Sequence, residues 1–391
     1  MIMNNSDTAH FVMTAVHGGH PSGRRHATLK IAPGNFFVRR DDPRTFRWQW
    51  DKQLPPLPEG EIEVAVEKFA LTANNITYAR LGDSGRYWDF FPQADGWGSV
   101  PVWGYGRVIA SRHEEIAEGE RIYGYFPMSS HLRLAPEKVT ARRFLDGAGH
   151  RRELPSTYNE YTRVTEPETD RENPHLVLRP LFSLSFFLAD WLQQQRAFGA
   201  EQILISSASS KTALGLGFML TGADRPAGEV IGLTAPANRS FVESTGLYDT
   251  VLCYSDLDTV RRRPSVYVDI SGNQSSRAAV HRHLGDALRH SCRVGFTHWD
   301  AASTNLRERE PGLPGPPPTL FFAPDHILAR RRAWGAERLA ETVRDHSARF
   351  YRHAARWLEI QSSHGPEAVE QVYLEVLEGR ARVDQANVLY W

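Results

Sequence analysis

Cysteine is scarce in this sequence, and its scarcity limits the possible chemistry. Only Cys253 and Cys292 occur among 391 residues, and neither has a neighbouring partner in the sequence. Such spacing does not predict a disulfide framework, and it is typical of a protein kept in a reducing compartment. We therefore expect the protein to work in the cytoplasm.

The sequence also lacks net charge and long apolar segments. Lysine and arginine together number 46, as do aspartate and glutamate, so the formal net charge is zero. This balance gives no electrostatic reason to expect nucleic acid or an anionic membrane as a partner. We predict no segment apolar enough to span a membrane, and the N-terminus lacks the pattern of a signal peptide. Residues 1–30 are interpreted as a flexible leader.

Metal-binding motifs are missing as well. No His-Glu-x-x-His helix occurs in the sequence. His281 and His283 fall in a predicted helix at a spacing that points their rings to different sides, so we expect surface positions for them. The sequence therefore predicts no metal site.

The pattern that is present changes along the chain. Between residues 61 and 136, alternating apolar residues and glycine-marked corners predict short strands of a small barrel or sandwich, as in EIEVAVEKFALT and VWGYGRVIAS. Residues 145–174 are polar and contain several prolines, and we interpret them as an excursion or linker. From residue 181, helices and strands alternate, beginning with LFSLSFFLADWLQQQRAFG and QILISSA. This alternation predicts an α/β fold with a doubly wound parallel sheet.

The turn after the first of these strands reads SSASSKT and contains no glycine. A Walker loop would need glycine where Ser210 and Ile205 stand, and a penicillin-binding type of nucleophile would need serine where Ala208 stands. The turn can still hold a phosphate, because the N-terminus of the following helix offers free N–H groups and a favourable dipole. Lys211 adds a positive charge, and the hydroxyl groups add donors. The predicted phosphate contacts are Ser207, Ser209, Ser210, Lys211 and Thr212. A serine-rich helix cap without a ligand is the alternative.

The next predicted strand indicates which nucleotide would bind. The segment GEVIGLTAPANRS ends without the Asp or Glu that accepts hydrogen bonds from a ribose diol, and offers Thr234, Asn238 and Arg239 instead. Neutral donors beside an arginine suit a 2′-phosphate, which favours NADP(H) over NAD(H). The alternative places Arg239 on an exposed helix face.

The order of these motifs resembles the medium-chain dehydrogenase/reductase superfamily, especially its zinc-independent quinone and enoyl reductase branches. The segment EVAVEKFALTANNITYARLG is similar to the first strand of that family and its asparagine-bearing turn. Gly119-Glu120-Arg121-Ile122 resembles the Gly-Asp-Arg-Val element, SSASSKTALGLGFML takes the place of the Ala-Ala-Gly-Gly-Val-Gly turn, and VDISG that of the Asp-x-x-Gly strand end. The segment GPEAVEQVYLEVLEGRARVDQANVLYW resembles the C-terminal return. The resemblance begins near residue 31; the missing glycines and the long excursion depart from the family pattern.

The resemblance implies two domains and a homodimer. A discontinuous GroES-like β-barrel catalytic domain would comprise residues 31–178 and 325–391, and a Rossmann nucleotide-binding domain residues 179–324. Dimers would form through edge pairing of the nucleotide domains. Some members of the superfamily hold zinc with cysteine and histidine, but Cys253 and Cys292 both fall in the nucleotide half.

Without zinc, the resemblance implies hydride transfer to an activated double bond, with hydrogen-bond donors holding the enolate. Tyr87 or Tyr78 would supply the proton near Asn74, and Phe322 would cover the nicotinamide together with its neighbour Phe321. Several aromatic residues in RYWDFFPQADGWG favour a flat or conjugated small-molecule substrate. The hypothesis is an NADP(H)-dependent reductase of an enone, enoyl thioester or quinone. The alternatives are a non-catalytic scaffold that keeps the fold and an NADPH-dependent tailoring enzyme that acts on a carbonyl.

Overall fold

The structure is a computed structural model that describes residues 33–169, 171–222, 228–294 and 312–391. The predicted leader, residues 1–30, lies outside the described residues. Near the start of the described chain, a small antiparallel sheet has the strand order β2-β1-β4. Its strands are β1 (Gly34–Arg39), β2 (Phe46–Trp50) and β4 (Trp97–Gly98).

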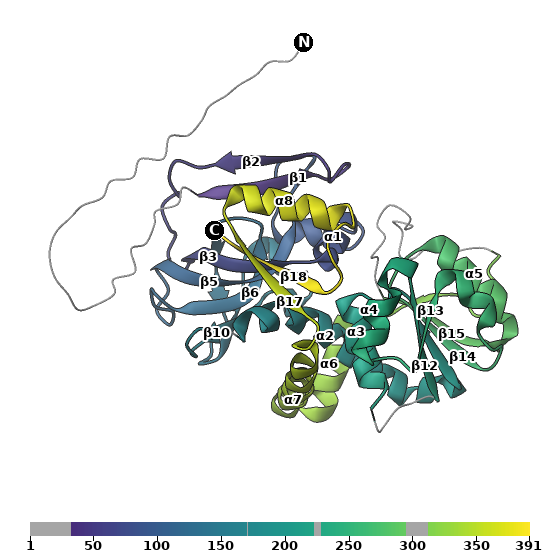
Figure 1. The fold of residues 1–391 in the computed structure, drawn as a ribbon. Helices are drawn as coiled ribbons and strands as arrows, with labels where there is room; N and C mark the ends of the chain where they lie inside the picture. Colours follow the sequence, from purple (N-terminus) through teal and green to yellow (C-terminus); the bar gives the residue numbers. More distant parts are fainter. Residues whose placement is uncertain (1–32, 170, 223–227, 295–311) are drawn as a thin grey trace, which may run out of the picture. The chain divides into compact units, whose positions relative to one another are not determined.

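A larger sheet has the order β17-β18-β3-β5-β6-β10-β9-β8, and β7 pairs with β3. Its strands are β3 (Ile62–Leu71), β5 (Pro101–Ser111), β6 (Arg121–Pro127), β7 (His131–Leu134), β8 (Pro136–Glu137), β9 (Arg143–Asp146), β10 (Glu160–Val164), β17 (Glu359–His364) and β18 (Gln385–Tyr390). Strand β18 runs antiparallel to β3 and parallel to β17. The C-terminal segment therefore completes a sheet that begins near the N-terminus, as the yellow strands beside β3 show (Figure 1).

The interpretation of residues 145–174 as a linker is wrong, because β10 pairs with both β6 and β9. Tyr161 anchors β10 in the core, where its ring stacks on Phe144 at 5.5 Å and its hydroxyl donates to the carbonyl oxygen of Tyr125. The other residues of β10 are only partly buried. One buried ring in a short strand is too weak a pattern to separate a strand from a polar loop.

A parallel sheet with the order β13-β12-β11-β14-β15-β16 follows in the chain. Its strands are β11 (Gln202–Ile205), β12 (Glu229–Thr234), β13 (Thr250–Cys253), β14 (Ser265–Asp269), β15 (Leu288–Arg293) and β16 (Thr319–Leu320). Between the strands run α3 (Lys211–Leu220), α4 (Arg239–Thr245) and α5 (Gln274–Leu284). Strands β11 and β14 are buried along their whole length, as expected for central strands covered on both faces. The predicted doubly wound α/β fold is confirmed.

Helix α2 (Glu172–Gln194) begins earlier than predicted and contains Pro180. It packs against α3, α6 (Ala323–Trp334) and α7 (Ala336–Ala354), with Phe182 stacked on Phe350 at a ring distance of 4.9 Å. By length and composition alone, α2 could cross a membrane, which corrects the prediction that no segment could. However, 67% of its most apolar window is buried inside the protein, so the same apolarity is explained by the core.

The remaining helices are α1 (Ala73–Arg80) and α8 (Pro366–Leu377), both beside the larger sheet. The predicted surface position of His281 is wrong, because this side chain of α5 is fully buried. Its ring nitrogens lie 2.9 Å from the carbonyl oxygen of Pro314 and 2.8 Å from Ser291 Oγ. Both ring nitrogens thus have partners, which is the condition for burying an imidazole.

Candidate functional site

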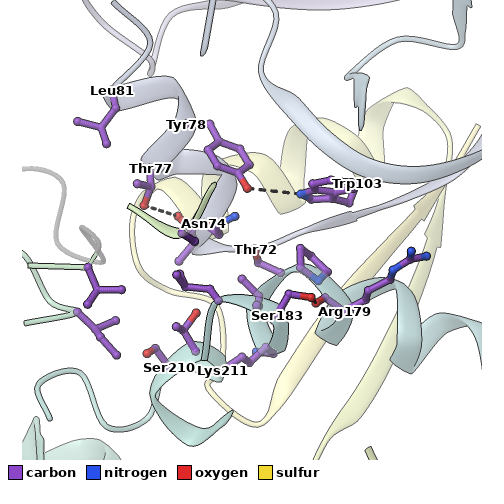
Figure 2. Close-up of a pocket in the computed structure, with 18 of the residues that line it drawn as sticks. Thr72, Asn74, Thr77, Tyr78, Leu81, Trp103, Arg179, Ser183, Ser210 and Lys211 are labelled. Carbon is purple, nitrogen blue, oxygen red and sulfur yellow. Dashed lines mark hydrogen bonds between the residues drawn. The ribbon is translucent and has the colours of Figure 1, made fainter. Parts of the chain in front are cut away.

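A cavity of about 1140 Å³ has walls from both the parallel sheet and the larger antiparallel sheet. It is lined by parts of α1, α2 and β10, by the turn between β11 and α3, and by residues 379–387. Figure 2 shows Ser210 and Lys211 of that turn at one side of the cavity, with Tyr78 and Trp103 at the other. The predicted site residues that line it are Asn74, Tyr78, Tyr87, Ser207, Ser209, Ser210, Lys211, Thr212, Thr234, Asn238 and Phe322.

The turn keeps its shape without glycine because neighbouring groups support it. Ser207 adopts the left-handed backbone conformation, with φ of 53°, and its N–H donates to the hydroxyl of Tyr254 at 2.7 Å. Ser206 Oγ accepts hydrogen bonds from the backbone N–H groups of Ile270 and Ser271, at 2.9 and 3.0 Å. Side chains and the adjacent strand β14 thus hold a conformation that other proteins obtain from glycine.

The support continues beneath the turn in a buried ion pair. Asp269, at the end of β14, pairs with Arg277 of α5, and both side chains are fully buried. The same carboxylate accepts hydrogen bonds from Ser206 Oγ, Ser271 Oγ and the backbone N–H of Gly272. The ion pair therefore links α5 to the floor of the turn.

The turn presents unpaired donors to the cavity. Ser210 caps α3, its Oγ accepting from the backbone N–H of Ala213 at 3.3 Å. Among the residues that the structure describes, the backbone N–H groups of Ser209, Lys211 and Thr212 have no acceptor. They stand at the N-terminus of α3, where the helix dipole attracts negative charge. This arrangement can bind an anion such as a phosphate.

Lys211 adds charge to these donors. Its ammonium lies 3.5 Å from the carbonyl oxygen of Val383. Burial lowers the pKa of Lys211 to about 8, although the nearby charge of Asp384 opposes the shift. An anion bound beside it would favour the protonated form.

The end of β12 contributes neutral groups. The hydroxyl of Thr234 is buried and, within the described part of the chain, has no hydrogen-bond partner. Asn238 Nδ2 donates to Ser209 Oγ at 3.2 Å, which ties this end of the site to the turn. Arg239 does not line the cavity; it is exposed and pairs with Glu243 at 2.9 Å and Asp256 at 3.4 Å. Of the predicted site residues, Arg239 is thus the exception.

Aromatic side chains form the opposite wall. The ring of Tyr78 lies 4.6 Å from that of Tyr87, and Trp103 Nε1 donates to the hydroxyl of Tyr78 at 3.4 Å. Tyr158 joins them, with its ring 6.0 Å from that of Tyr87. Burial raises the pKa values of all three phenols, so they stay protonated at neutral pH and can donate hydrogen bonds.

The lining residues that sequence reasoning missed include Tyr158 and Arg179. Tyr158 lies in the segment interpreted as a linker, where nothing in the sequence marks it. Arg179 lies on α2, and the signal that could have identified it is a charged residue inside an apolar helix. Within the described residues, no group of three or more His, Cys, Asp or Glu side chains is placed to hold a metal ion.

Comparison with known proteins gives the family and supports the fold. A family model described as "protein of unknown function (DUF2855)" matches residues 69–382, most of the chain. The chain belongs to the DUF2855 family. No curated protein matches the sequence of this DUF2855 protein.

Solved structures resemble this DUF2855 protein along almost its whole length. CurA from Vibrio vulnificus in complex with NADPH is 16% identical, with 91% of this chain and 98% of that chain covered and a TM-score of 0.61. The CurK enoyl reductase is 12% identical, with 92% and 99% covered and a TM-score of 0.52. A mutant of Etr1p in complex with NADP and crotonyl-CoA is 10% identical, with 92% and 100% covered and a TM-score of 0.52. At these identities the likeness concerns the fold, and it confirms the predicted reductase-like architecture.

Proposed function

We propose that this protein is an NADP(H)-dependent oxidoreductase that reduces an activated carbon–carbon double bond. One observation carries the proposal: an anion-binding helix N-terminus and a wall of protonated phenols face the same cavity. The first suits a nucleotide phosphate, and the second suits the developing negative charge of an enolate. The similar structures of CurA with NADPH and of Etr1p with NADP and crotonyl-CoA support this class of reaction.

The residues of the cavity fit a dinucleotide. The N–H groups of Lys211 and Thr212, with the ammonium of Lys211, would hold its phosphates. Thr234 and Asn238, at and after the end of β12, would lie beside the adenosine ribose, and no carboxylate ends β12 to accept from a ribose diol. When bound, the reduced nicotinamide supplies hydride. Phe322, half exposed at the cavity, would cover it.

The chain's own residues would then polarise the substrate. Tyr87 and Tyr158 are only partly buried and line the cavity, so their hydroxyls can reach a substrate carbonyl oxygen. Tyr78 is buried and held by Trp103, which suits a positioning role. Asn74 offers a further donor from the start of α1.

NADPH should bind at least about ten-fold more tightly than NADH, because hydrogen bonds from the neutral groups of Thr234 and Asn238 to the ionised 2′-phosphate would have no counterpart in NADH. Titration of the purified protein, followed by protein and nicotinamide fluorescence, measures both affinities. Equal affinities would contradict the choice of cofactor, and no binding of either would favour a non-catalytic scaffold. Trials with an enone, an enoyl thioester, a quinone and a simple ketone would then separate double-bond reduction from carbonyl reduction.

At saturating NADPH, tyrosine ionisation should not lower kcat between pH 6 and pH 10. The raised pKa values of Tyr87 and Tyr158 keep both phenols protonated across this range. A pH profile of kcat for the wild-type protein and the Tyr87→Phe and Tyr158→Phe variants tests this. A decline as the pH approaches about 10 that either substitution removes would show that the phenol titrates at its ordinary pKa.

We also propose that the chemistry is independent of zinc and that the substrate is flat or conjugated. The barrel domain would comprise residues 31–178 and 325–391, and the nucleotide domain residues 179–324. The protein would be a homodimer in the cytoplasm. Strand β16 is an end strand of the parallel sheet within the described residues, which is compatible with edge pairing. Light scattering at micromolar concentration would distinguish the dimer from a monomer.

A further inference from the structure

The charged residues that line the cavity differ in whether they have a partner. Arg86 pairs with Asp89, and Arg382 pairs with Asp384. Among the lining residues that the structure describes, Lys211 and Arg179 are the cations with no carboxylate oxygen within 4.0 Å. Lys211 belongs to the phosphate turn. Arg179 has no role in the function proposed above.

Arg179 lies on the aromatic side of the cavity. Its guanidinium carbon lies 4.2 Å from the ring centre of Tyr123, and its Nη2 lies 3.4 Å from Thr162 Oγ1, a long and weak hydrogen bond. Trp103 stacks on Tyr123 at 5.7 Å. Figure 2 shows Arg179 and Trp103 on the same side of the cavity.

A second polar group beside Arg179 lacks a hydrogen-bond partner. Tyr123 is 3% exposed and lines the cavity, yet within the described residues its hydroxyl has no hydrogen-bond partner. A partly buried guanidinium without a carboxylate partner and a buried hydroxyl without an acceptor are both costly to a folded protein unless something else satisfies them. An anionic ligand at this position would supply what both groups lack.

We propose that Arg179 binds a carboxylate of the substrate, so that the substrate class is a conjugated carbonyl compound that carries a carboxylate group. This inference rests on the proposed function for the reaction, but the anion site follows from Arg179 and Tyr123 alone. A planar guanidinium matches a carboxylate with two parallel hydrogen bonds, and the rings of Tyr123 and Trp103 suit a flat conjugated chain.

The surrounding charges favour a single carboxylate over a phosphate. Glu160 also lines the cavity but is neutralised by Arg143, whereas Glu153 and Asp325 add negative charge to the lining. One guanidinium, in a cavity whose lining also contains Glu153 and Asp325, balances a monoanion better than a dianion. In the proposed function Lys211 binds the cofactor phosphates, so it would not also bind the substrate carboxylate.

The test measures binding and does not depend on turnover. Cinnamate, a flat conjugated carboxylate, and its neutral methyl ester are titrated into the free protein and into the NADP⁺ complex by isothermal calorimetry. Cinnamate should bind at least about ten-fold more tightly than the ester, as expected for a charged hydrogen bond. Arg179→Met should abolish this preference, and Arg179→Lys should keep part of it, because the charge remains without the fork. Arg86→Met, at a paired arginine in the same cavity, should leave it unchanged.

The outcomes separate the two proposals. No preference for cinnamate in the wild-type protein, or a preference that survives Arg179→Met, would overturn the carboxylate site. Competition between cinnamate and NADPH would also overturn it, because the anion would then occupy the cofactor site. Loss of the preference in Arg179→Met, with NADPH affinity and thermal unfolding unchanged, would support it. Failure of NADPH to bind would instead refute the proposed function, and the cinnamate titration of the free protein would still decide the role of Arg179.

Discussion

Lys211→Met should weaken NADPH binding by about 10- to 100-fold, the equivalent of losing one charge-assisted hydrogen bond worth about 1.5–3 kcal/mol. Lys211 is the cation at the N-terminus of α3, and methionine keeps its apolar stem while removing the ammonium. Fluorescence titration with NADPH measures the change. Arg239→Ala is the matched control, because this exposed and already paired arginine lies outside the cavity, and it should change the affinity by less than about threefold.

The same lysine makes the affinity depend on pH. The pKa of Lys211 is lowered to about 8 in the free protein, so the ammonium is present below that pH and lost above it. The dissociation constant for NADPH should therefore rise as pH increases through about 8, whereas that of Lys211→Met should stay flat over this range. A large loss of affinity in Arg239→Ala, with little change in Lys211→Met, would show that the phosphate lies elsewhere.

Asp269→Ala should lower the free energy of unfolding by about 3–5 kcal/mol, because it leaves the buried guanidinium of Arg277 without its carboxylate. Ser206 and Ser271 would lose an acceptor at the same time. Urea denaturation followed by circular dichroism measures the effect. Because the turn rests on this network, the variant should also bind NADPH less tightly under conditions in which it is folded.

The double variant Asp269→Ala, Arg277→Met isolates the cause of this loss. The double variant also removes the buried guanidinium that Asp269→Ala deprives of the Asp269 carboxylate, so it should be more stable than Asp269→Ala alone. If it is equally or less stable, the cost comes from the hydrogen bonds to Ser206, Ser271 and Gly272 rather than from breaking the ion pair.

The sequence predicted the parts of the site that lie next to each other in the chain. The turn from Ser207 to Thr212 could be placed because a buried apolar strand precedes it and a helix follows, and local patterns of this kind survive folding. Asn74 and Tyr78 could be placed because α1 follows β3 directly. That these residues share one cavity could be predicted only from the order of the motifs, because hydrophobic periodicity alone predicts no contact between distant segments.

Other parts of the site depend on contacts that leave no local pattern. Arg179 faces the cavity because α2 begins nine residues earlier than the apolar pattern indicates, with Pro180 inside the helix. Tyr158 reaches the cavity from the turn before β10, a strand in which Tyr161 is the one buried residue. Arg239 follows the right strand, but it pairs with Glu243 one helical turn away and with Asp256, which the sequence does not place beside it.

The pairing of β18 with β3 has a consequence for synthesis on the ribosome. Strand β3 is made long before β18, its antiparallel partner along one edge. Until then the edge of β3 and the apolar face covered by α8 stay open, and residues 379–387 cannot yet wall the cavity. One edge of β3 therefore stays open while the intervening residues are made, although β5 and β7 can already pair with the strand, and an open edge is a site for aggregation or for chaperone binding. A truncation before residue 379 would remove strand β18 and the site wall together.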